Sequence, residues 1–122
     1  MIYIKDNYKA MPKSVLRIYS RYSREAVSLL AGFIRTARKE KKLTVQELAD
    51  RAGISRGMLQ RIEKGDMKCE IGVVFEVAAI VGLKLFEADE STLTRYIRQT
   101  QDKLSLLPKS VRKTTRAVDD EF

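Results

Sequence analysis

The sequence predicts an all-α fold, because helix start and stop signals alternate with apolar periodicity along the centre of the chain. Thr44 with Glu47 fits the capping box that begins a helix, and Gly53 fits the left-handed residue that ends one. Ser55 then fits the N-cap of a second helix. We expect four to five helices around one core, a short strand after them, and extra helices in both flanks.

The segment from Thr44 to Lys64 predicts two short helices joined by a tight turn. The inward positions combine one small residue with three larger apolar ones: Leu48, Ala49, Leu59 and Ile62. At about 100° per residue, the outer face of the second helix carries polar or small residues, which are Gly57, Gln60, Arg61 and Lys64, with Arg56 on its flank. An ordinary amphipathic hairpin is the alternative. The joint fit of glycine, cap and apolar anchors favours a helix-turn-helix that binds duplex DNA.

Two further helices are expected to pack on this pair. The first begins at a Ser23 cap and runs to about Lys41, with these apolar residues at helical spacing: Ala26, Leu30, Phe33, Ile34 and Ala37. The second ends at Gly82 and has its own apolar series: Ile71, Val74, Phe75, Ala78 and Val81. These helices complete the predicted core.

A short strand is expected at Leu83–Phe86, where apolar and polar residues alternate after Gly82. A lone strand leaves its backbone hydrogen bonds open, so pairing with the same strand of a second subunit would give a two-fold homodimer. An extended connector packed on the helices is an equal alternative.

Both flanks extend beyond this core. Pro12–Arg24 alternates arginines with apolar residues and predicts an amphipathic helix. Ser91 is expected to cap a C-terminal helix that ends before Pro108, and the polar, charged segment after it predicts disorder. We therefore expect three parts: an N-terminal extension over residues 1–22, the helical domain over 23–86, and a C-terminal helix with a disordered charged tail over 87–122.

The charge of the chain favours a nucleic-acid partner. The formal net charge is +8, and ten basic residues against five acidic ones lie between Arg35 and Lys68. A basic surface also suits an anionic membrane or an acidic protein, so charge alone does not decide. The helix-turn-helix pattern indicates that the partner is double-stranded DNA.

Enzymatic and metal-binding functions are not expected. Residues Gly53–Gly57 fit the G-x-S-x-G pattern of a serine nucleophile, but that chemistry needs a histidine and the sequence has none. Ser55 is better explained as an N-cap. The lone Cys69 and the lack of histidine also argue against a zinc site, so no cofactor or metal is expected. Neither a signal peptide nor a membrane span is apparent, which predicts a cytoplasmic, nucleoid-associated protein.

From about Leu30 to Phe86, IRTARKEKKLTVQELADRAGISRGMLQRIEKG followed by FEVAAIVGLKLF resembles the Xre or Cro/CI type of repressor domain, which has a lambda-repressor-like helix-turn-helix fold. The resemblance implies that Arg38 and Glu63 form a partly buried ion pair that positions the recognition helix. It also implies that residues at the start of that helix and one turn later contact base edges: Arg56, Gly57, Gln60 and Arg61. Arginine and glutamine can each donate two hydrogen bonds, to guanine and adenine respectively.

Phosphate contacts are expected on either side of these positions. Many relatives place a phosphate-binding glutamine where this chain has Val45, so the neighbouring polar groups and the helix N-terminus must serve instead. The residues predicted to contact phosphate are Thr44, Gln46, Ser55, Lys64 and Lys68. Such contacts fix the register of a protein on DNA without reading its sequence.

The resemblance implies a sequence-specific, homodimeric repressor of transcription. A small basic repressor with a charged C-terminal extension also resembles, more weakly, the HipB-type antitoxins that pair with HipA-like kinases and repress their own operons. Three alternatives remain open. One is a toxin-neutralising interaction module with secondary DNA binding, another is a stand-alone phage-type repressor, and the last is an RNA-binding or nucleoid protein that uses charge alone.

Overall fold

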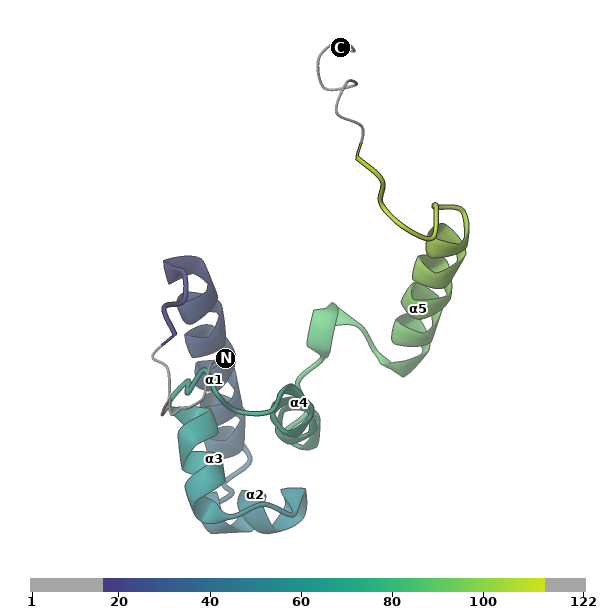
Figure 1. Cartoon of the computed structure of the whole chain (residues 1–122). Helices are drawn as coiled ribbons and strands as arrows, with labels where there is room; N and C mark the ends of the chain where they lie inside the picture. The colour runs from purple at the N-terminus through teal and green to yellow at the C-terminus, as the bar shows by residue number, and fades with distance from the viewer. Residues whose placement is uncertain (1–16, 114–122) are drawn as a thin grey trace. The chain divides into compact units, whose positions relative to one another are not determined.

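The computed structural model describes residues 17–113, and the ordered elements in this range are all helical (Figure 1). In chain order they are α1 (Arg21–Glu40), α2 (Val45–Ala52), α3 (Arg56–Glu63), α4 (Ile71–Ile80), the short 3₁₀ helix η1 (Leu85–Glu87) and α5 (Glu90–Ser105). The predicted all-α class is confirmed. The chain divides after Leu83 into two compact units.

The core of the first unit draws one fully buried aliphatic side chain from each of its four helices. These side chains are Ile34, Leu48, Leu59 and Val77. Helix α2 contacts both α3 and α4, and α3 lies beside α1 (Figure 1). Each such side chain stabilises the fold by roughly 1.5 to 3 kcal/mol relative to leaving it exposed. Packing between helices therefore holds this unit together.

Local signals set the ends of α2 and α3 as the sequence predicts. The Glu47 amide donates to Thr44 Oγ1 at 3.0 Å, and the Thr44 amide donates to Glu47 Oε1 at 2.8 Å, which completes the capping box. Gly53 ends α2 in the left-handed conformation, at φ 69° and ψ 32°. Ser55 Oγ then accepts the Met58 amide at 3.0 Å and caps α3. The predicted turn between the two helices is confirmed.

Helix α1 differs from its prediction at its start and in its buried face. Its N-cap is Ser20 rather than Ser23, whose amide donates to the Ser20 hydroxyl. Residues 17–20 are not helical, so the predicted helix over Pro12–Arg24 is wrong there, and its first part lies outside the described residues. Phe33 is 51% exposed, although we expected it in the core. The core contacts only a narrow side of α1, and Phe33 lies about 100° away from buried Ile34.

Helix α4 is apolar on nearly all sides but is covered on only one. Val77 and Ala78 are buried, as is Val81 directly after the helix. Ile71 is 69% exposed, which corrects its expected place in the core. It lies on the same side of the helix as Ala78 but two turns earlier, beyond the part that the core covers.

The predicted strand at Leu83–Phe86 is wrong. The Leu83 amide bonds to the Ala78 carbonyl, and the chain then forms η1 instead of extending. Phe86 and Glu87 have left-handed backbone angles, with φ of 57° and 52°. Such angles turn the chain, so this segment cannot present a row of backbone groups to a second strand. Strand pairing therefore provides no basis for a dimer.

The N-cap of helix α5 lies two residues earlier than expected, and the helix ends before Pro108, as the sequence predicts. Its N-cap is Asp89 rather than Ser91: Asp89 Oδ1 accepts the Thr92 amide at 2.8 Å and the Ser91 hydroxyl at 3.1 Å. Hydrogen bonds from Thr92 and Ser91 lower the pKa of Asp89 to about 2. Residues 106–113 follow without a helix, and the rest of the predicted disordered tail lies outside the described residues.

Within residues 17–113, no helix combines the length and apolar character required to cross a bilayer. The same range contains no cluster of three or more histidine, cysteine or acidic residues able to hold a metal ion.

Candidate nucleic-acid interface

Helix α3 is anchored to the core by one side and exposes the other. Leu59 is fully buried and Ile62 is 3% exposed. These residues lie three apart and so share one face of the helix. This packing fixes the backbone of α3 and so the positions from which the polar side chains of the opposite face extend.

An ion pair joins the end of α3 to α1. Arg38 Nε donates to Glu63 Oε2 at 2.7 Å, and Arg38 Nη2 donates to Glu63 Oε1 at 2.9 Å. The side chains are only 9% and 7% exposed, and Arg38 Nη1 also donates to the Leu43 carbonyl at 2.9 Å. Hydrogen bonding to Glu63 raises the pKa of Arg38. This planar, two-bond geometry fixes direction as well as distance between the helices.

The structure places every residue predicted to contact DNA on the surface. The four candidates for base contacts, Arg56, Gly57, Gln60 and Arg61, are all exposed on α3. The five candidates for phosphate contacts are exposed too: Thr44, Gln46, Ser55, Lys64 and Lys68. They come from the start of α2, the start of α3 and the loop after α3.

The two arginines of α3 differ in their side-chain hydrogen bonds. Among residues 17–113, Arg56 and Gln60 have no side-chain hydrogen bond or ion pair, so all their donors are available to a ligand. Arg61 Nε instead pairs with Asp66 Oδ2 at 2.8 Å. That hydrogen bond raises the pKa of Arg61 and lowers the pKa of Asp66. A guanidinium has five N–H donors, so the Nη groups of Arg61 remain available.

Several of the predicted phosphate-binding groups already have partners within the fold. Gln46 Nε2 donates to Asp50 Oδ1 at 2.8 Å. The hydroxyl oxygens of Thr44 and Ser55 accept backbone amides, but each hydroxyl keeps its own proton for donation. The Lys68 amide donates to Asp66 Oδ1.

Two acidic partners were absent from the sequence-based prediction, Asp50 and Asp66. Gln46 and Asp50 are four residues apart on one helix, a spacing at which side chains meet, so this pair could have been found. Arg61 and Asp66 are separated by the end of α3. Their approach depends on Gly65, whose φ of 77° turns the chain, and a Cβ there would lie 3.5 Å from Ser28 Cα of α1. This packing contact has no local sequence signal.

Comparison with curated proteins gives no match, and comparison with solved structures also gives none. A family model described as helix-turn-helix matches residues 34–87. The matched range begins inside α1 and ends with η1, and it contains all of α2, α3 and α4. The match and the geometry of the two short helices together identify residues 34–87 as a helix-turn-helix domain.

Proposed function

We propose that this chain is a sequence-specific, double-stranded DNA-binding regulator of transcription that places α3 in the major groove. One observation carries the proposal: Arg56 and Gln60 are exposed without side-chain partners in residues 17–113. They lie on a helix whose other face is packed in the core and joined to α1 by an ion pair. The major groove admits an α-helix and gives each base pair a distinct pattern of donors and acceptors. The surrounding helix-turn-helix match supports the same function.

Each residue of the site has a proposed role. Arg56 reads guanine and Gln60 reads adenine, and each good two-bond contact contributes about 1 to 3 kcal/mol of discrimination. Arg61 uses its Nη donors on a base while Asp66 holds its Nε. Gly57, which has no side chain, lets α3 approach the base edges. Residues Thr44, Gln46, Ser55, Lys64 and Lys68 bind the phosphates beside the groove. Arg38 and Glu63 hold α3 at the required angle.

The finer role that we propose is repression by a homodimer at the cytoplasmic nucleoid. Dimers with this type of recognition helix contact two half-sites about one helical turn, roughly 34 Å, apart. Occupation of such an operator excludes other proteins from the same DNA, so binding alone is enough for repression.

Selection of duplexes from a randomised pool tests sequence-specific binding. On the selected duplex, Arg56→Ala and Gln60→Ala should each raise Kd by roughly 5- to 150-fold, because each loses a base contact worth about 1 to 3 kcal/mol. On unrelated duplexes the same variants should change Kd little. Arg61→Ala should behave like Arg56→Ala, and an equal loss on both duplexes would instead make Arg61 a phosphate contact.

Lys68→Ala is the matched control for these variants. It should weaken binding to both duplexes alike and reduce the dependence of affinity on salt, because it removes one phosphate contact. Failure to enrich any sequence would contradict specific recognition and favour the RNA-binding or charge-only alternative.

An antitoxin function within a HipBA-like operon is a second proposal. It is supported by the apolar side chains that α5 exposes outside the matched domain, including Ile97 at 56% and Leu104 at 62%. A surface of this kind suits a protein partner such as a HipA-like kinase. Co-expression with the product of the adjacent gene, followed by copurification, tests it. Loss of the complex in Ile97→Glu is the expected result, and a chain that purifies alone from this co-expression contradicts the antitoxin role.

A further inference from the structure

Helix α1 has a second apolar stripe that its own core does not cover. Its apolar residues, at alternating intervals of four and three, are Tyr22, Ala26, Leu29 and Phe33, and Thr36 and Glu40 continue the same spacing as the polar end of this outer stripe. All six are exposed, with Tyr22 at 83%, Leu29 at 58% and Phe33 at 51%. Alternation of four and three is the heptad spacing that helices use when they pair side by side.

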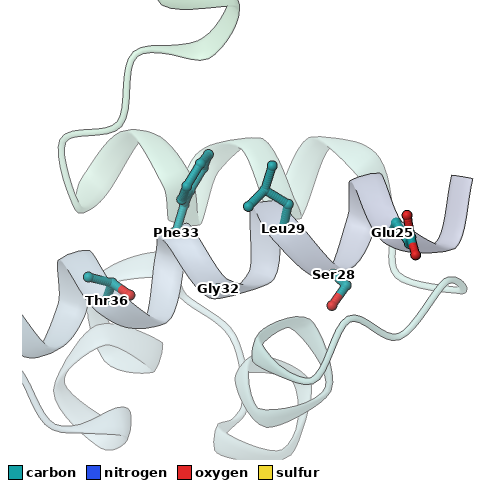
Figure 2. A pocket seen from close by; sticks show the side chains of 6 residues that line it. All are labelled: Glu25, Ser28, Leu29, Gly32, Phe33 and Thr36. Atoms are coloured by element: carbon teal, nitrogen blue, oxygen red, sulfur yellow. The ribbon is translucent and has the colours of Figure 1, made fainter. Parts of the chain in front are cut away.

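The outer stripe lies away from the domain core, with Phe33 about 100° and Leu29 about 140° around α1 from buried Ile34. The buried residues of this helix are Ala31, Ile34 and Arg38, and through that side α1 contacts α3. Leu29 and Phe33 project together from the other side (Figure 2). They border an open groove that Glu25, Ser28, Gly32 and Thr36 complete. Packing among residues 17–83 therefore gives no reason for the stripe to be apolar.

Contacts among residues 17–113 do not explain Gly32 either. It lies in the interior of α1, where glycine is less favourable than alanine, and its φ is not in the region that requires glycine. A Cβ added to Gly32 would meet nothing within 4 Å. The missing side chain keeps the groove between Leu29 and Phe33 open, which suits the close approach of another helix.

We propose that the outer stripe is a self-association surface, on which α1 of a second copy of this chain packs in antiparallel orientation. In the heptad pattern, an antiparallel partner places Leu29 opposite the partner's Phe33, and two-fold symmetry repeats this contact. Ala26 then lies opposite the partner's Thr36, and the two Gly32 residues meet near the symmetry axis. The outer apolar residues of both copies become buried together.

Charges beside the outer stripe select this orientation. Glu25 and Lys39 occupy equivalent flanking positions seven residues either side of Gly32. The antiparallel arrangement brings Glu25 against the partner's Lys39, twice by symmetry. A parallel arrangement would instead place Glu40 against the partner's Glu40, which is repulsive. Glu25 now bonds Arg21 at 3.0 Å, but both side chains are largely exposed, and such pairs exchange at little cost.

This association uses the side of α1 that faces away from α3, so it leaves the exposed face of α3 uncovered. The inference concerns assembly and does not depend on DNA binding. It also replaces the strand pairing that the turn at Phe86 excludes.

Sedimentation of the full chain without DNA tests the proposal. The wild type should show a monomer–dimer equilibrium, and Leu29→Glu and Phe33→Glu should each raise the dimer Kd by about tenfold or more, because a charge would be buried. Leu104→Glu is the matched control: it makes the same change at an exposed leucine of α5 and should leave the equilibrium unchanged. At concentrations below the dimer Kd the melting temperature should change little, because both stripe residues are exposed in the single chain.

Charge exchange tests the antiparallel orientation. Glu25→Lys and Lys39→Glu should each raise the dimer Kd by about two- to tenfold, and the double variant should restore it. A monomeric wild type, a dimer insensitive to Leu29→Glu and Phe33→Glu, or a double variant without rescue would overturn the proposal. None of these results would affect the base specificity measured with Arg56→Ala.

Discussion

The two units of the chain are stabilised in different ways. In residues 17–83, four helices each bury an aliphatic side chain in a shared core. From Lys84 to residue 113, Ala88 is the only buried apolar residue, and α5 has none. The side-chain hydrogen bonds of α5 are local instead: the Asp89 cap stabilises the start of the helix, and the Thr100 hydroxyl donates to the Tyr96 carbonyl at 2.8 Å. The stability of the first unit should therefore depend on packing between helices, and the stability of α5 on local hydrogen bonds.

The largest expected difference between the units follows from truncating one leucine in each. Leu48→Ala should destabilise the first unit by about 2 to 5 kcal/mol, because it removes a fully buried side chain and leaves a cavity. Leu104→Ala should change the free energy of unfolding by less than about 0.5 kcal/mol, because the side chain is already 62% exposed. Denaturant unfolding measures both. Equal losses would mean that α5 is packed against something after all.

The first unit could be predicted from the sequence better than the second, because several independent signals agree in the first and only one is present at the start of the second. Around Thr44, Gly53 and Ser55, cap, turn and apolar spacing all agree, so α2 and α3 could be predicted to within a residue or two. At Leu83–Phe86 the only signal is alternation over four residues. Alternation does not report backbone angles, and the left-handed Phe86 turns the chain where a strand was expected.

Competing signals explain the other errors. Ser20 and Ser23 are both able to cap α1, and Asp89 and Ser91 are both able to cap α5, so composition alone cannot choose between them. Phe33 and Ile34 are adjacent in a helix that has two apolar sides. Periodicity identifies both sides, but only the arrangement of the other helices decides which one the core covers. The roles of the exposed site residues remain predictions, because a free surface does not report its ligand.

A polar interaction inside the packed unit gives the next largest expected effect. Glu63→Ala should cost about 3 kcal/mol, because it leaves the largely buried Arg38 guanidinium without its partner. The double variant Arg38→Met with Glu63→Leu should lose much less, because no charge is then left unpaired. Thermal unfolding of the three proteins distinguishes these cases. A Glu63→Ala variant that melts with the wild type would show that the pair contributes nothing to stability.

Two glycines offer a smaller and sharper comparison within the first unit. Gly57 and Gly72 are each the second residue of a helix, and a Cβ at either would meet no atom closer than 4.0 Å. Substitution by alanine should therefore stabilise the protein by roughly 0.5 to 1 kcal/mol at both positions. Only Gly57→Ala should also weaken binding to the selected duplex, because α3 approaches the bases there. Unchanged affinity in both variants would remove Gly57 from the proposed DNA-binding surface.

The smallest expected effect concerns the cap that begins α5. The pKa of Asp89 is lowered from 3.8 to about 2, so the ionised carboxylate is more stable in the folded state than in the unfolded state. Its stabilisation is therefore complete above about pH 5 and is lost progressively as the pH falls through 3.8 to about 2. The amide resonance of Thr92, which donates to this carboxylate, should shift with a midpoint near pH 2. Asp89→Ser keeps a capping oxygen but removes the titration, so its Thr92 resonance should stay constant. A wild-type midpoint at the ordinary value of 3.8 would mean that the cap does not form in solution, and α5 would then lack the local bond on which its separate stability depends.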